Sequence, residues 1–138
     1  MGGERVYLGY GNYDEDYCHL CDGKGYMLSF EHIRPSWCAA TSADPKGWTP
    51  ENPSHGQCAV TALVVQDLLG GTLLRTINDG ISHYWNRLPT GIEVDLTREQ
   101  FRGWNPGEIV ERDREYVLSF PETAARYELL KELMNESH

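Results

Sequence analysis

The chain has 138 residues, 40% of them hydrophobic, and carries a formal net charge of −9. That length suits one domain with its own core. The acidic balance disfavours nucleic acid and anionic membranes as partners, because both are bound through clustered lysine and arginine. No apolar run approaches the ~20 residues of a membrane span, and the first residues lack an apolar signal core. We therefore expect a cytoplasmic protein with reduced cysteines.

Residues 1–33 are expected to form an irregular appendage to a single α+β domain over residues 34–138. The appendage contains Cys18 and Cys21 in the Cys-x-x-Cys spacing of one half of a zinc site. A closed site needs four ligands, and the only further candidates are His19, His32 and Cys38. We expect a pair of thiols rather than a metal centre, and zinc binding stays open as the alternative.

The next segments predict a loop followed by a central helix. Prolines and tryptophans recur over residues 34–53, which predicts an extended loop. Residues 57–69 are apolar on nearly every side and are followed by two glycines, which predicts a buried helix with Ser54 as a plausible N-cap. A buried strand is the alternative for this segment, because it is rich in β-branched valine.

The second half of the chain predicts a small antiparallel sheet and a C-terminal helix. Residues 72–77, 82–88 and 92–97 have the composition of three strands, separated by loops that contain glycine. Residues 116–119 could form another strand. Residues 121–134 begin with proline and place apolar side chains on one side of a helix.

The second hairpin of this sheet brings a histidine and a carboxylate together. If Leu88 pairs with Ile92, then Trp85 lies opposite Asp95. Because side chains alternate along a strand, His83, Trp85 and Asp95 then share one face, and His83 and Asp95 are diagonal neighbours. A carboxylate in that position can accept the imidazole N–H, fix the tautomer and favour the charged ring.

Cys58 supplies a possible nucleophile for this pair. It lies at or near the N-terminus of the predicted helix, where the helix dipole and free N–H groups favour a thiolate and could hold a developing oxyanion. Cys58, His83 and Asp95 would then be nucleophile, base and orienting group of a triad. A lone cysteine in a buried helix is more often a small hydrophobic residue, so the prediction depends on all three together.

The motifs around these three residues resemble a known superfamily. Gly56-Gln57-Cys58, His83-Tyr84-Trp85 and Asp95-Leu96-Thr97 are similar to the transglutaminase-like core, in which these motifs occupy a helix start and two successive strands. A longer set of motifs, running from about Arg34 to the C-terminus, resembles the YunG-type family of small bacterial proteins: Trp48-Thr49-Pro50, Asn52-Pro53-Ser54, Gly56 to Leu63, His83 to Asn86 and Asp95 to Phe101. The resemblance implies a papain-like or transglutaminase-like fold, with no known substrate.

Three further residues could assist the triad. Papain-like enzymes often carry an amide side chain upstream of the cysteine to stabilise the oxyanion, and Gln57 or Asn52 could serve. Alternatively, Gln57 caps the helix and Asn52 belongs to a turn. Trp85 is expected to pack as the floor of the site.

The leading functional hypothesis is a cysteine hydrolase or acyl transferase. Cys58 would attack an amide, ester or thioester carbonyl of a peptide, a protein or a small acyl compound, and no cofactor is required. The second hypothesis is an inactive binding module that uses the same fold for a peptide or protein partner. The third is a zinc-stabilised interaction protein built around Cys18 and Cys21. The sequence leaves the oligomeric state open.

Overall fold

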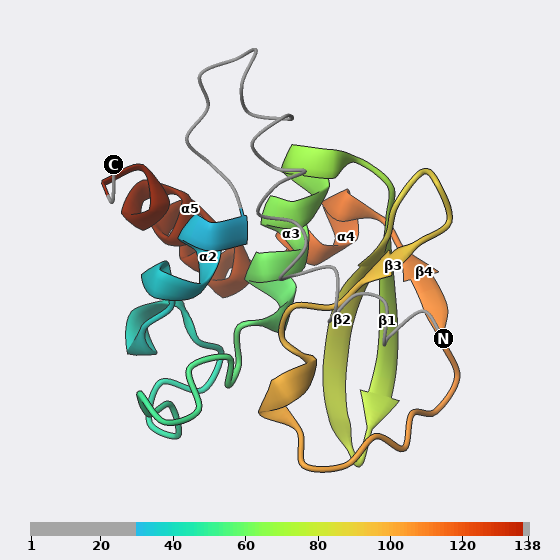
Figure 1. Ribbon diagram of the computed structural model, residues 1–138, viewed down its shortest axis with the longest axis horizontal. Coiled ribbons are helices and arrows are strands. Elements are labelled where there is room, and N and C mark those ends of the chain that lie inside the picture. Colours follow the sequence, from blue (N-terminus) through green and yellow to red (C-terminus); the bar gives the residue numbers. More distant parts are fainter. Residues whose placement is uncertain (1–29, 137–138) are drawn as a thin grey trace.

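The computed structural model describes residues 30–136, which form an α+β fold of four α-helices and a four-stranded antiparallel sheet (Figure 1). The helices are α2 (Phe30–Ser36), α3 (Cys58–Leu69), α4 (Arg114–Leu118) and α5 (Pro121–Glu136). The strands are β1 (Thr72–Asn78), β2 (Ile81–Arg87), β3 (Glu93–Val94) and β4 (Val110–Arg112), in the order β3-β2-β1-β4. Two short 3-10 turns are η1 (Ala39–Thr41) and η2 (Arg98–Gln100).

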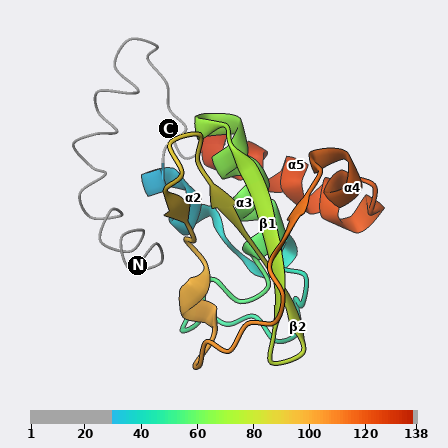
Figure 2. The ribbon, with the colours of Figure 1, turned by 90° about the vertical axis from the view of Figure 1, so that its right-hand side faces the viewer.

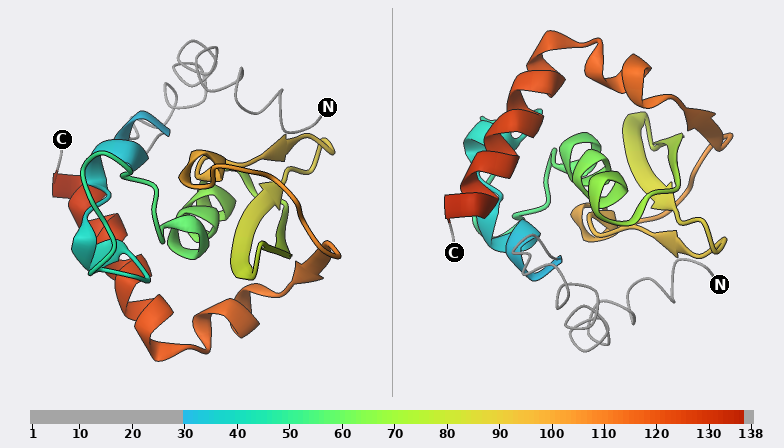
Figure 3. Two further views of the ribbon diagram at one scale, coloured as in Figure 1. Left: turned by 90° about the horizontal axis from the view of Figure 1, so that it is seen from below. Right: turned by 90° about the horizontal axis from the view of Figure 1, so that it is seen from above.

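The central helix α3 lies between the sheet and α5, as the two views in Figure 3 show. Its residues from Val60 to Val65 are buried, as expected for a helix that is apolar all round. On the sheet side, the Asn86 side chain donates a hydrogen bond to the Ala62 carbonyl at 2.9 Å, and Leu73 packs in the same core. On the far side, α5 contributes Tyr127, Leu130 and Met134 to that core.

The β1–β2 hairpin turns tightly at Asp79-Gly80. Both residues have positive φ, 51° and 84°, which is the geometry of a two-residue type I′ turn. The turn fixes a register in which Thr76 pairs with His83 and Leu74 with Trp85. These four side chains therefore share one face of the sheet, opposite the face that packs on α3.

The connection between β3 and β4 covers this second face. The Thr76 hydroxyl donates to the Glu108 carbonyl at 2.9 Å, and the Asn78 amide donates to the Gly103 carbonyl at 3.1 Å. Figure 2 shows the result, with η2 and the pair α4–α5 on opposite sides of the β1–β2 hairpin. The sheet is thus covered by helices on one face and by a loop on the other.

Several boundaries differ from the sequence predictions. Residues 116–119 are helical in α4 and not a strand, because Val117 and Leu118 are adjacent apolar residues that turn into the core together rather than alternating. The third strand is only Glu93–Val94. Ser54 is not the N-cap of α3, because the cap position is Gln57.

Helix α2 spans the expected boundary at residue 34. Helix α2 begins at Phe30, includes Pro35 and places the fully buried Ile33 in the core, so residues 34–36 are helical rather than extended. Cys18, His19 and Cys21 lie outside the described residues. No helix within residues 30–136 is long and apolar enough to cross a membrane.

Candidate active site

Cys58 is the first residue of α3, one position after the Gln57 cap. The first N–H groups of an α-helix have no acceptor within the helix, so those of Cys58 and its neighbours point outward from the helix start. Gly56 shapes the approach to the cysteine. Its φ is +72°, and a Cβ atom there would lie 2.2 Å from the Ser42 hydroxyl oxygen and 2.9 Å from the Ala43 nitrogen. A side chain at position 56 is therefore excluded.

His83 and Asp95 form a buried pair, at the register expected from the hairpin. Asn86 pairs with Val94 and the Leu88 N–H donates to the Ile92 carbonyl, as the predicted pairing requires. His83 is 0% exposed and Asp95 3%. The histidine Nε2 lies 2.8 Å from the Asp95 Oδ2.

Arg98 is a third member of this network that sequence reasoning missed. Its Nε donates to the same Asp95 Oδ2 at 2.7 Å, so one carboxylate oxygen accepts two charge-assisted hydrogen bonds. Arg98 begins η2, three residues after Asp95. Its place in the motif Asp95 to Phe101 was the available signal, because two residues three apart in a turn can contact each other.

The Cys58 thiol lies against the remaining side of His83. Strand β3 pairs with β2 only at Asn86 and Arg87. Within residues 30–136, the stretch of β2 from Ile81 to Trp85 therefore has no strand partner on the edge away from β1. Cys58 approaches along that edge, and its Sγ lies 3.7 Å from the Ser82 carbonyl oxygen. The His83 Nδ1 is buried and has no hydrogen-bond partner among the described residues. It is the ring nitrogen left to face the thiol.

The histidine is held in its charged form. Burial acts to lower the pKa of His83, but the hydrogen bond with Asp95, the neighbouring Cys58 side chain and the negative charge of both together act more strongly and raise it to about 9. At neutral pH the ring therefore carries a proton on each nitrogen. The arrangement can give a proton to a group at the sulfur, while Asp95 keeps the ring in place.

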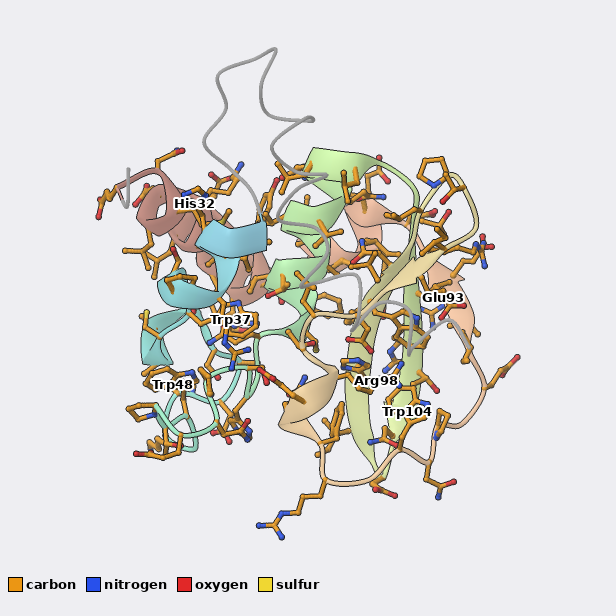
Figure 4. The ribbon with its side chains drawn as sticks, viewed as in Figure 1. His32, Trp37, Trp48, Glu93, Arg98 and Trp104 are labelled. Atoms are coloured by element: carbon orange, nitrogen blue, oxygen red, sulfur yellow. The ribbon has the colours of Figure 1, made fainter. Side chains whose placement is uncertain are left out.

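Aromatic rings enclose the histidine. Trp85 stacks on it at 5.5 Å between ring centroids, and Phe101 and Trp104 contact it edge-on at 4.9 and 5.6 Å. Figure 4 shows the Arg98 and Trp104 side chains together in front of the sheet, and the Arg98 guanidinium carbon lies 3.5 Å from the Trp104 ring centroid. Phe101 and Trp104 were not predicted, because no periodic pattern marks a loop residue that folds back onto a sheet.

A pocket of about 320 Å³ adjoins this cluster. Asp95, Arg98, Phe101 and Trp104 are among its lining residues, whereas Cys58 and His83 are not. Trp85, the predicted floor, is buried and donates its indole N–H to Glu93 at 2.9 Å.

The two amides proposed for the oxyanion lie in different settings. Gln57 is fully buried, and its Nε2 donates to the Cys38 carbonyl at 3.0 Å while its Oε1 accepts from the Thr41 hydroxyl at 2.8 Å. It therefore ties the helix start to η1 and makes no side-chain cap. Asn52 lies in the preceding loop, where its backbone N–H donates to Thr49 at 3.0 Å. The oxyanion role stays a prediction for both.

The described residues offer no site for a metal ion. Within residues 30–136, no three histidine, cysteine, aspartate or glutamate side chains gather closely enough to ligate one. Cys38, one of the candidate ligands for the Cys18–Cys21 pair, is a free thiol.

The fold and the site together define a small α+β protein with a cysteine at the start of its central helix, beside a buried histidine–aspartate pair. A family model described as "YunG protein" matches residues 29–138, and the chain belongs to this YunG family. Over 70 residues it is 44% identical to "Uncharacterized protein YunG" of Bacillus subtilis (strain 168), a match that covers 51% of this chain and 57% of that protein. No solved structure matches the chain. The predicted family is confirmed, and its matched region begins next to the start of α2.

Proposed function

We propose that this protein is a cysteine hydrolase or acyl transferase with a transglutaminase-like core and the triad Cys58–His83–Asp95. One observation carries the proposal. The His83 ring donates Nε2–H to a buried carboxylate at 2.8 Å and leaves Nδ1 for a thiol at a helix start. That is the arrangement of nucleophile, acid–base group and orienting group that acyl transfer through a covalent intermediate requires.

The proposed reaction has two halves, formation of an acyl-enzyme and its breakdown, and Cys58, His83 and Asp95 act in both. The proton that the Cys58 thiol gives up is held on the His83 Nδ1. The sulfur attacks the carbonyl carbon of an amide, ester or thioester, the bond from that carbon to the leaving group breaks, and the Nδ1–H protonates the leaving group. Asp95 and Arg98 hold the ring in position through Oδ2. Water then attacks the acyl-enzyme in a hydrolase, or an amine attacks it in a transferase, with His83 taking up the proton of the attacking group. A peptide, a protein or a small acyl compound in the cytoplasm would be the substrate.

Alkylation kinetics test the proposal without a known substrate. We expect iodoacetamide to label Cys58 faster than Cys38, the other half-buried free thiol among residues 30–136. Replacing His83 by alanine should slow the labelling of Cys58 by about tenfold or more, since it removes the acid–base partner of the thiol. His55→Ala is the matched control, because His55 also pairs with a carboxylate, Asp44, at 2.9 Å but on the surface.

The control variant should leave the labelling of Cys58 unchanged. Peptide mapping by mass spectrometry assigns each alkylated residue. Slow labelling of Cys58 in the native protein, or equal rates in the two histidine variants, would sink the enzyme proposal.

A second candidate is an inactive transglutaminase-like module that binds a peptide or protein. The pocket beside Asp95 favours it, because that pocket is lined by Arg98, Phe101 and Trp104 and does not reach the thiol. Under this proposal Trp104, which is 36% exposed, is a contact for the partner. An inert Cys58 together with partner capture that Trp104→Ala abolishes would favour the module.

A further inference from the structure

Half of the described arginines lack a carboxylate partner among residues 30–136, and two of these, Arg75 and Arg126, interact with Cys58 or with its neighbour Ser82. Arg34, Arg87, Arg98 and Arg114 each form an ion pair. Among residues 30–136, no carboxylate lies within ion-pair distance of four others: Arg75, Arg102, Arg112 and Arg126. In a chain with 21 acidic and 12 basic residues, carboxylates are plentiful. Unpaired arginines gathered at one place are therefore available to an anionic ligand.

Arg75 is linked to the thiol through one residue. It lies on β1 opposite Tyr84, on the face of the sheet that α3 covers. Its Nε donates to the Ser82 hydroxyl at 3.0 Å, and the Ser82 carbonyl is the group that lies 3.7 Å from the Cys58 sulfur. That hydrogen bond leaves the two terminal nitrogens of the guanidinium free to bind a ligand.

Arg126 approaches the thiol from α5, the helix that packs against α3. Its terminal nitrogen donates to the Thr123 hydroxyl at 3.3 Å, and its buried Nε is bonded to no described group. Burial lowers the pKa of Arg126, while the negative charge of Glu122 and of Cys58 raises it. Cys58 is thus within electrostatic range of this guanidinium.

Aromatic side chains lie beside two of the unpaired arginines, Arg75 and Arg112. Tyr84 lies beside Arg75, and burial raises the pKa of its hydroxyl, so the ring stays neutral. Tyr116 contacts the Arg112 guanidinium at 5.5 Å and meets Phe120 edge-on at 5.4 Å, and both aromatic residues are nearly half exposed. Glu122 is the carboxylate whose negative charge raises the pKa of Arg126.

We propose that the substrate of Cys58 carries a carboxylate group, which Arg75 binds beside the thiol while Arg126, on the helix packed against α3, adds positive charge. The inference rests on the proposed function, because it names the chemical class of substrate for that site. A guanidinium is suited to the role because it binds a carboxylate with two parallel hydrogen bonds. The carboxylate comes from the C-terminus of a peptide or from an acidic side chain.

Two alkylating reagents that differ only in charge test this proposal. In both reactions the thiolate forms a carbon–sulfur bond, the carbon–iodine bond breaks, and iodide leaves. Iodoacetate carries a carboxylate and iodoacetamide does not. Arg75→Gln and Arg126→Gln should each slow alkylation of Cys58 by iodoacetate about two- to threefold, as expected for unit charges roughly 8 Å apart in water. The double variant should lose about fivefold, and each loss is measured relative to the iodoacetamide rate of the same variant, so that a change in the thiol itself cancels.

Arg87→Gln is the control, because it removes one positive charge from the far end of β2. It should alter neither rate, and added salt should reduce the iodoacetate rate only where the arginines are present. Equal effects of the double variant on both reagents, or none on either, overturn the carboxylate proposal and leave the triad standing. A Cys58 that is inert to both reagents overturns the triad and this inference together.

Short peptides distinguish the two sources of carboxylate. N-acetyl-Ala-Ala with a free C-terminus, N-acetyl-Ala-Glu-amide and N-acetyl-Ala-Ala-amide are compared for protection of Cys58 against iodoacetamide. Stronger protection by the first indicates a C-terminal carboxylate, and stronger protection by the second indicates an acidic side chain. Equal protection by all three, or none, overturns recognition of a carboxylate.

Discussion

The buried His83–Asp95 pair makes the stability of this protein depend on pH in a defined direction. Burial acts to lower the pKa of His83, but the hydrogen bond with Asp95 and the neighbouring charges of Asp95 and Cys58 outweigh it, and the pKa is raised from 6.5 to about 9 in the folded protein. Folding therefore favours the protonated ring. This contribution is fully present below about pH 6.5 and is lost as the pH rises through about 9.

The interval between the unfolded and folded pKa values of His83 sets the size of this contribution to stability. It corresponds to roughly 3 kcal/mol of unfolding free energy, lost at no more than about 1.4 kcal/mol per pH unit. Urea unfolding followed by tryptophan fluorescence between about pH 6 and 10 measures it. Asp95→Asn keeps the shape of the side chain and removes its charge, so its curve should be lower at pH 6 and much flatter.

Comparison of the two proteins isolates the contribution of the His83–Asp95 pair, because they differ only in the charge of residue 95. A wild-type free energy that stays level, or rises, between about pH 6.5 and 9 would refute the reasoning. It would mean that His83 is neutral in the folded protein. The acid–base role assigned to it would then need a different starting protonation state.

Two substitutions test the surroundings of the triad. Gly56→Ala, at a φ of +72°, places a Cβ atom 2.2 Å from a serine hydroxyl oxygen. Its control is Gly80→Ala, at a φ of +84°, where the Cβ atom meets nothing within 4 Å. We expect Gly56→Ala to lower the unfolding free energy by about 1–3 kcal/mol more than the control does, and to slow alkylation of Cys58. Arg98→Gln removes one of two donors to the buried Asp95 Oδ2, so it should lower the unfolding free energy by about 1–3 kcal/mol and slow alkylation of Cys58. Its control, Arg102→Gln in the same loop, should change neither quantity. Equal behaviour within either pair would contradict the contacts described here.

Local patterns predicted the elements that build the site. The apolar run before Gly70 predicted α3, and the glycine-containing turns predicted β1 and β2. The pairing of Leu88 with Ile92 then followed from turn length, and alternation of side chains placed His83 beside Asp95. These features depend on interactions between residues close together in the chain, so local sequence patterns predict them.

Long-range contacts were out of reach for the same reason. Nothing in the sequence of the β3–β4 connection indicates that Trp104 folds back onto His83, because the loop has neither a helical nor an alternating pattern. The four-residue segment 116–119 was short enough for either structure, and packing of Val117 into the core decided for a helix. Gln57 occupies the N-cap position of α3, but its side chain bonds to Cys38 and Thr41, which lie 19 and 16 residues earlier in the chain, and no local pattern indicates these bonds.

The energetics of the buried pair argue for a role beyond stability. Taking two charges out of water costs several kcal/mol, and a well-packed apolar replacement is often as stable or more so. In this protein the charged pair is buried at one position, beneath Trp85 and Trp104 and next to the Cys58 thiol at the start of α3. A core built only for stability would fill that position with aliphatic side chains, as it does around Leu63 on the other face of the sheet. The proposed chemistry at Cys58 would account for a buried charged pair at this position, and the alkylation rates of Cys58 in wild type and in His83→Ala test it.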